Sequence, residues 1–109
     1  MKGDPGLALL GLGARGGNLV FGTAGVQAAM RRGRLALIIV ARDRSQRTVD
    51  KVERAARARD VPVMEGPSAV ELGAAVGRSP LMAVGITDPR LAEGYRARAG
   101  ERTGGSRGE

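Results

Sequence analysis

Six glycines lie in the segment GLGARGGNLVFGTAG at residues 11–25, and Gly11, Gly13 and Gly16 have the spacing G-x-G-x-x-G. In a dinucleotide site this motif follows a strand, opens a helix and precedes, by about 20 residues, an acidic residue that binds the ribose. Here a helix is predicted before Gly11, and the next acidic residue is Asp43. The pattern therefore favours tight turns over a nucleotide site, and we expect no cofactor.

A second glycine turn, Gly22-Thr23, precedes a segment with helical spacing of its apolar residues. The first N–H groups of a helix have no partner within it and lie at its positive dipole end, so a helix that starts here could hold an anion such as phosphate. Gly25 would allow a backbone or a base to approach closely. The same residues also fit a structural role, in which Thr23 caps the helix and Gly25 permits close packing.

The residue types that support most catalytic and metal chemistry are missing from this chain. It has no Cys and no His, which removes disulfides, thiol nucleophiles, the commonest zinc ligands and the usual general base. It lacks a G-x-x-x-x-G-K-[ST] loop, and its 11 Asp and Glu residues show no clustered metal-ligand spacing. We expect no catalytic residues, no metal site and no enzymatic activity. A hydrolase built on two carboxylates that meet only in space is the remaining enzymatic alternative.

The charge balance favours a polyanionic partner. Lys and Arg number 18 against 11 Asp and Glu, which gives a formal net charge of +7, and all the basic residues except Lys2 and Lys51 are Arg. Because the planar guanidinium matches phosphate and guanine edges, this bias suits RNA. An Arg-rich proteome encoded by a GC-rich genome is the alternative explanation.

A chain of 109 residues fits one domain with its own core. Only Phe21 and Tyr95 are aromatic, so aliphatic side chains must fill that core. The longest apolar run, residues 35–41, is far shorter than the roughly 20 residues that span a bilayer, and the N-terminus lacks the features of a signal peptide. We therefore expect a cytoplasmic protein without a membrane partner.

Helical and strand-like segments alternate along the chain and must position these residues. The run LALIIVA at residues 35–41 is typical of a central strand covered on both faces, and Ser68 with Glu71 predicts a capping box. The patterns predict helices at about 4–14, 23–32, 46–59, 68–76 and 88–98, and strands at 18–21, 35–41, 61–64 and 81–86. This order indicates an α/β/α sandwich with helices on both faces of a mixed sheet. Residues 99–109 are rich in glycine and polar residues and are predicted to form a disordered basic tail.

Five segments, in this order, resemble one superfamily of ribosomal proteins. They are RGGNLVFGT at residues 15–23, LIIVARD at 37–43, VPV at 61–63, ELGAAVG at 71–77 and AVGITD at 83–88. From about residue 7 to 95 the chain is similar to the kink-turn-binding superfamily of L-seven-Ae and L-thirty-e type, which includes small bacterial YlxQ-like proteins. The resemblance implies one domain over residues 1–98, with an α/β/α fold and a four-stranded mixed sheet.

The same resemblance implies RNA binding at the start of the second helix and at the loop before the fourth helix. Family members that grip kink-turn RNA use polar residues after the helix-start glycine to contact sheared G·A pairs, whereas this chain has Ala24, Gly25 and Ala28 there. Gln27 and Arg31 would replace the lost contacts. The candidate RNA-binding residues are Asn18, Gly22, Thr23, Gln27, Arg31, Gly66, Pro67 and Ser68.

Two functions follow from the sequence. The first is a non-enzymatic, ribosomal-protein-like monomer that binds ribosomal or other structured RNA, with the ribosome as a candidate partner. The alternative is a scaffold that has lost kink-turn recognition and acts as a protein-interaction module or contacts RNA by charge alone. Each lost base or phosphate contact costs about 1–3 kcal/mol, so several losses would reduce affinity to the non-specific level. An apolar patch around Leu19 and Phe21 would favour the alternative.

Overall fold

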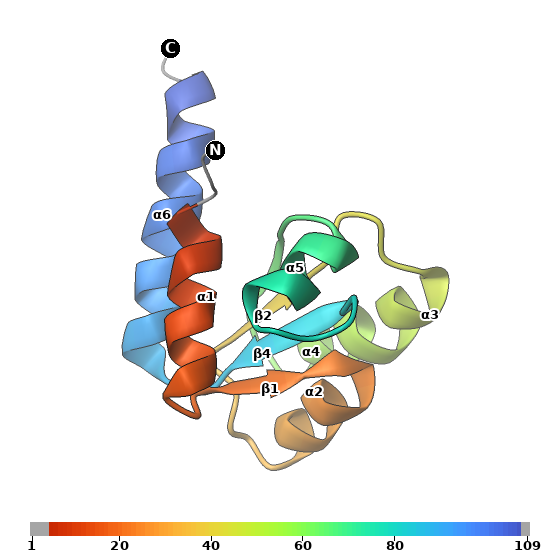
Figure 1. Cartoon of the computed structure of the whole chain (residues 1–109). Coiled ribbons are helices and arrows are strands. Elements are labelled where there is room, and N and C mark those ends of the chain that lie inside the picture. Colours follow the sequence, from red (N-terminus) through yellow and green to blue (C-terminus); the bar gives the residue numbers. More distant parts are fainter. Residues whose placement is uncertain (1–4, 108–109) are drawn as a thin grey trace.

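The computed structural model describes residues 5–107, with side chains to residue 99, and shows a four-stranded mixed sheet between two layers of helices (Figure 1). The helices are α1 (Pro5–Arg15), α2 (Gly22–Arg31), α3 (Gln46–Thr48), α4 (Arg54–Ala58), α5 (Ala69–Ala75) and α6 (Pro89–Arg107). A π-helical segment, η1 (Val49–Glu53), joins α3 to α4. The strands are β1 (Leu19–Phe21), β2 (Leu37–Val40), β3 (Val63–Glu65) and β4 (Ala83–Ile86). The predicted α/β/α sandwich is confirmed, while expectations for residues 1–4 and 108–109 lie outside the described residues.

The strands lie in the order β1-β4-β2-β3, so β1 and β3 are the two edge strands of this sheet. β2 and β3 are parallel, with Ile38 opposite Val63. β4 runs antiparallel to both of its neighbours, and Val84 lies opposite Phe21 on one side and Ile39 on the other. β1, β2 and β3 therefore all point the same way.

This topology gives the sheet two distinct ends. The end where β1, β2 and β3 finish and α2 begins is called the Gly22 end, and it comprises residues 22–23, 41–45, 66–68 and 77–82. The opposite end, where α2 finishes, is called the Arg32 end, and it comprises residues 16–18, 32–36, 59–62 and 87–88. Any site at one end draws residues from loops that are far apart in sequence.

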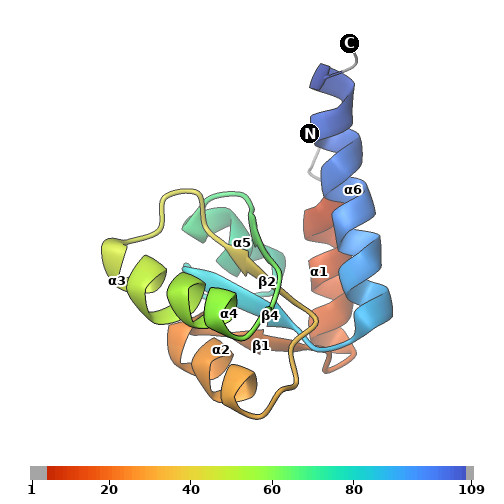
Figure 2. The ribbon, with the colours of Figure 1, turned by 180° about the vertical axis from the view of Figure 1, so that it is seen from behind.

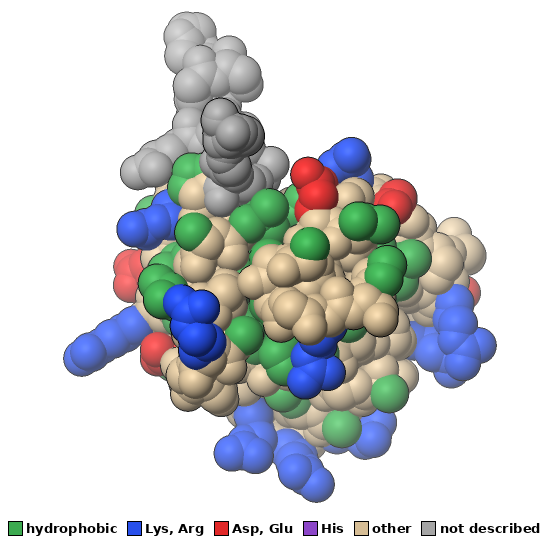
Figure 3. All heavy atoms as spheres, viewed as in Figure 1, with side chains coloured by type: hydrophobic (Ala, Val, Ile, Leu, Met, Phe, Trp, Pro, Cys, Tyr) green, Lys and Arg blue, Asp and Glu red, His purple; other side chains and the backbone are tan. Residues whose placement is uncertain are grey.

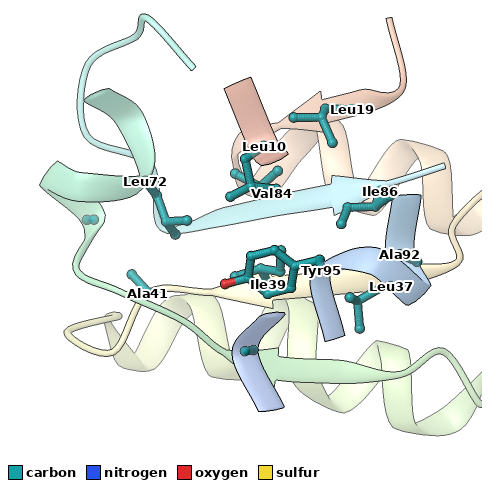
Figure 4. Close-up of a cluster of buried hydrophobic side chains, with 12 residues drawn as sticks. Leu10, Leu19, Leu37, Ile39, Ala41, Leu72, Val84, Ile86, Ala92 and Tyr95 are labelled. Atoms are coloured by element: carbon teal, nitrogen blue, oxygen red, sulfur yellow. The ribbon is translucent and has the colours of Figure 1, made fainter. Parts of the chain in front are cut away.

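Alternate residues of β2 face opposite layers of the sandwich, and all four are buried. Leu37 and Ile39 belong to a cluster with side chains from α1, α5 and α6, in which Tyr95 is fully buried (Figure 4). Ile38 and Val40 pack with side chains of α2, η1 and α4 on the other face. Figure 2 shows α2 and α4 covering that face of the sheet. Burial of each large aliphatic side chain contributes about 1.5–3 kcal/mol, so both layers stabilise the sheet.

Four helices in the described chain finish with a left-handed residue: Gly17, Gly33, Asp60 and Gly77 have positive φ angles. After α2, the N–H of Gly33 donates to the Met30 carbonyl at 3.0 Å and that of Arg34 to the Ala29 carbonyl at 3.1 Å. This is the Schellman pattern, which satisfies the last helical carbonyls. The same pair of bonds follows α5, where the N–H of Arg78 donates to the Gly73 carbonyl at 2.8 Å. The backbone after each helix is therefore held firmly.

Residues 46–59 do not form the single regular helix that the pattern predicted, because η1 separates α3 from α4. A π-helical turn rotates less per residue than an α-helical turn, so residues four apart stay nearly in line. Thr48, Val52 and Ala56 have this spacing, and all three are buried. The widened turn thus keeps one face of this segment against the sheet.

The last helix is longer than predicted, because α6 continues past residue 98 to Arg107. Residues 99–107 are thus helical in the structure, whereas their composition predicted a disordered tail. No Pro follows Pro89, and a glycine inside a helix weakens it by about 1 kcal/mol without ending it. Within the described range, no helix is both long and apolar enough to cross a bilayer.

Candidate functional site

The start of α2 is an uncapped helix N-terminus at the Gly22 end. Phe21 occupies the capping position, and no side-chain hydrogen bond caps the helix, so the alternative in which Thr23 caps it is wrong. Gly22 has a φ of 79°, which L side chains rarely adopt, and this conformation lets the chain pass directly from β1 into α2. The first N–H groups of α2 have no intrahelical partner and can bind an anion.

The loop at residues 77–82 lies next to this helix start because β4 is the neighbour of β1. The guanidinium of Arg78 stacks over the Phe21 ring, with its Cζ 3.9 Å from the ring centroid. Arg78 is exposed and makes no ion pair with the described side chains. The sequence patterns placed a helix end at about residue 76 and missed Arg78, since no local signal shows that β1 pairs with β4.

Gly73 of α5 lets this loop pack closely against the helix. A Cβ atom on Gly73 would lie 2.1 Å from the backbone oxygen of Ser79 and 2.8 Å from that of Arg78. Both contacts are with backbone, so the loop would have to move to accept any side chain there. The position of Arg78 therefore depends on a glycine at residue 73.

The other arginines at the Gly22 end are paired with carboxylates. Arg42 Nη1 lies 3.2 Å from a carboxylate oxygen of Glu71. Arg44 contacts both Glu53, at 2.5 Å from Nε, and Glu65, at 2.8 Å from Nη1. The hydrogen bond to Glu53 is the main reason that the pKa of Arg44 is raised. Much of the positive charge at this end is thus neutralised within the protein.

The predicted residues Gly66, Pro67 and Ser68 hold the fold together. Gly66 and Pro67 are buried, and a Cβ on Gly66 would lie 2.6 Å from a methyl group of Ile39. The hydroxyl of Ser68 accepts the N–H of Glu71 at 3.1 Å, while the Ser68 N–H donates to the Glu71 carboxylate at 3.0 Å. These two bonds confirm the predicted capping box of α5. Of the three residues, the half-buried Ser68 is the accessible one.

The structure does not bring Asn18 and Arg31 to Gly22. Arg31 lies nine residues after Gly22 in α2, which is about 13.5 Å along the helix axis. Asn18 precedes β1 whereas Gly22 follows it, and the Asn18 carbonyl accepts the N–H and the hydroxyl of Thr87 at 2.9 and 3.1 Å. Gln27 lies midway along α2 and is half-buried. The predicted set is therefore divided between the two ends of the sheet.

Among the described side chains no apolar patch forms around Leu19 and Phe21, since Leu19 is buried and Phe21 lies under Arg78. The exposed large apolar side chains within the described residues are Leu12 on α1, 56% exposed, and Val70 on α5, 63% exposed. A shallow groove runs between these two helices and is lined mainly by small side chains (Figure 3). Apart from Arg15 and Glu71, the residues that line this groove are apolar or glycine.

The chain matches a known family over most of its length. The model of the ribosomal protein L7Ae/L30e/S12e/Gadd45 family matches residues 7–93. The chain belongs to this family. The superfamily resemblance of the five sequence segments is confirmed by that match. A search of curated protein sequences found no match.

Solved structures similar to this L7Ae/L30e/S12e/Gadd45 member share its fold. A protein of unknown function from Bacillus halodurans C has a TM-score of 0.83 and 27% identity, over 88% of this chain and 97% of that chain. The 15.5kD RNA binding protein of Giardia lamblia has a TM-score of 0.72 and 24% identity, over 87% of this chain and 82% of that chain. Across the part of this family member that the structure describes, no group of three acidic side chains is placed to hold a metal ion.

Proposed function

We propose that this protein is a non-enzymatic RNA-binding protein that docks structured RNA at the Gly22 end of its sheet. The observation that supports this most directly is the uncapped start of α2 beside the unpaired guanidinium of Arg78. A helix N-terminus and a guanidinium both attract phosphate. Membership of a family of ribosomal proteins and the RNA-binding neighbour from Giardia lamblia agree with this function.

In this proposal the free N–H groups after Gly22 bind a phosphate or the edge of a sheared G·A pair. The hydroxyl of Thr23 and the amide of Gln27 add polar contacts along the exposed side of α2, and Arg78 adds a charge from the neighbouring loop. Ser68 is the accessible residue of the loop at residues 66–68, which is more distant from Gly22. Asn18 and Arg31 are too far from Gly22 to share a contact with it, so they leave this set. The RNA in this proposal is ribosomal RNA or another structured RNA of the cytoplasm.

A binding assay with a labelled kink-turn stem tests the proposal. The comparison is a matched stem in which Watson–Crick pairs replace the sheared G·A pairs, and both are measured at two salt concentrations. We expect a preference for the kink-turn that persists at the higher salt, because shape-specific contacts depend less on salt than phosphate contacts do. Equal and strongly salt-dependent binding to both stems would contradict docking at the Gly22 end.

A matched pair of variants tests the role of Arg78. Arg78→Gln is expected to weaken kink-turn binding by about 5–100-fold, as for the loss of one phosphate or base contact. Arg47→Gln removes the same charge from an exposed position on α3 and should have a smaller effect. Equal effects of the two variants would show that Arg78 contributes only to the net charge.

The groove between α1 and α5 supports a second candidate function, a protein-interaction module. Its floor includes Ala8, Gly11, Ala74 and Ala75, and Leu12 beside it is exposed. For this candidate, Ala8→Glu would abolish partner binding or self-association in sedimentation and leave RNA binding unchanged. A monomeric wild type with a clear kink-turn preference would eliminate it in favour of RNA docking.

A further inference from the structure

Four arginines gather at the Arg32 end of the sheet, opposite the proposed docking site. Arg31, Arg32 and Arg34 lie at the end of α2, and Arg59 lies at the end of α4. All four are exposed, and none of them forms an ion pair in the part of the chain that the structure describes. These four residues are called the arginine cluster. It contrasts with the Gly22 end, where Arg42 and Arg44 are paired with carboxylates.

Two hollows lie between the members of the cluster. The larger, about 490 Å³, is lined by Arg31, Arg32 and Arg59, among others. The smaller, about 250 Å³, is lined by Arg32 and Arg34 together with Gly25 of α2. Arg32 therefore borders both hollows, and Lys and Arg side chains project from the rim of the molecule below α2 (Figure 3). A phosphate strand that crossed this end would meet several guanidinium groups in succession.

The backbone of the cluster is fixed by two helix ends. The Schellman bonds after α2 hold Arg34, and after α4 the N–H of Val61 donates to the Ala56 carbonyl at 2.9 Å. One carboxylate, Asp60, lies beside Arg59 and lines the larger hollow. Its φ of 58° gives it a structural reason to be there, because Asp tolerates the left-handed conformation that ends α4.

A structural role explains part of the cluster, because a cation near a helix C-terminus interacts favourably with the helix dipole. That effect falls off within the last turn and does not require basic residues on both sides of two hollows. Unpaired guanidinium groups on a rigid, concave surface match the geometry of phosphate oxygens, to which Arg forms bidentate hydrogen bonds.

We propose that the arginine cluster is a second RNA-contact surface, which binds the sugar-phosphate backbone by charge and does not read base sequence. This inference rests on the proposed function, because the RNA docked at the Gly22 end is the polyanion that reaches the cluster. The ten residues of α2 separate the two ends by about 15 Å, a span that one folded RNA covers. In this proposal the Gly22 end recognises the shape of the RNA, and most of the salt dependence of RNA binding arises at the Arg32 end.

The salt dependence of RNA binding tests this assignment. The cluster variant R31Q/R32Q/R34Q/R59Q is compared with a control, R47Q/R54Q/R96Q/R98Q, that removes the same charge from exposed positions outside the cluster. Affinities for the kink-turn stem and the matched stem are measured over a range of salt. The slope of log K against log salt should fall by about 3 in the cluster variant and by less than about 1 in the control. Thermal unfolding establishes whether both variants fold. If the fourfold cluster variant does not fold, R32Q/R34Q replaces it, and its slope of log K against log salt is expected to fall by about 1.5.

Each outcome separates this inference from the proposed docking site. An unchanged slope in the cluster variant overturns the inference, while a kink-turn preference in the same data would uphold docking at the Gly22 end. A reduced slope without any kink-turn preference in the wild type upholds the cluster and overturns the docking site. If the cluster variant binds RNA as the wild type does but no longer binds poly-glutamate, the inference is overturned in favour of an acidic protein partner. No RNA binding by the wild type overturns both.

Discussion

Gly22 and Gly25 stand one turn apart on α2, yet only the first is required by the backbone. Gly22 has a φ of 79°, whereas a Cβ on Gly25 would meet nothing within 4 Å. We expect Gly22→Ala to reduce the free energy of unfolding by about 1–2 kcal/mol and Gly25→Ala to raise it by up to about 1 kcal/mol. Urea denaturation of both variants measures these changes. A Gly22→Ala protein as stable as the wild type would show that the turn relaxes without strain.

The carboxylate of Glu71 makes the protein sensitive to acid. The N–H of Ser68 is the main reason that the pKa of Glu71 lies below its ordinary value of 4.5, and Arg42 lowers it further. Because the folded pKa is the lower one, the stabilisation is complete above about pH 4.5 and is lost as the pH falls through the folded pKa. In Glu71→Gln the capping acceptor remains but the charge is gone.

The expected result is that wild type and Glu71→Gln differ in stability at neutral pH and converge as the pH falls below about 4.5 and through the lowered pKa of Glu71. Urea midpoints measured at several pH values provide the comparison. If the stability of the two proteins changes in parallel over this pH range, the hydrogen bonds of Glu71 do not stabilise its charged form relative to its protonated form in solution.

The packing of α5 against the loop at residues 77–82 controls the position of Arg78. Gly73→Ala would place a methyl group 2.1 Å from the backbone oxygen of Ser79, so the loop must shift. We expect a loss of about 1–3 kcal/mol in stability, together with a weakened kink-turn preference. Gly25→Ala is the matched control, because it makes the same change in a helix without a steric neighbour. A Gly73→Ala protein with normal stability and RNA preference would show that the loop moves at no cost.

Local patterns predicted the helices and strands well, because the signals that set their ends are local. Ser68 and Glu71 marked the start of α5, and the helix ends predicted at about residues 32 and 76 lie directly before Gly33 and Gly77, which have positive φ angles. Arg78 could not be found in this way, since its place beside Phe21 depends on the pairing of β1 with β4. Arg31 was assigned to the docking site from its spacing along the sequence, although a full helix length separates it from Gly22.

The boundary of the domain near residue 99 stays a prediction that truncation tests. Among the described side chains, Tyr95 and Ala99 are the last buried residues, and both belong to the cluster beneath α6. Removal of residues 100–109 should therefore change the free energy of unfolding by less than about 1 kcal/mol. Removal of residues 91–109, which takes Tyr95 away, should abolish cooperative unfolding measured by circular dichroism. A large loss from the shorter deletion would extend the domain into the rest of α6.

The pairing of β1 with β4 also governs when this protein becomes functional during its synthesis. β1 is an edge strand whose neighbour in the sheet is β4, with Leu19 opposite Ile86. Chains emerge from the ribosome N-terminus first, so β1 must wait until the residues of β4 have been made before its partner strand appears. A nascent chain stalled before β4 carries the residues of α2 but cannot assemble the Gly22 end. Under the proposed function, each newly made molecule therefore becomes competent to dock RNA only after β4 has emerged.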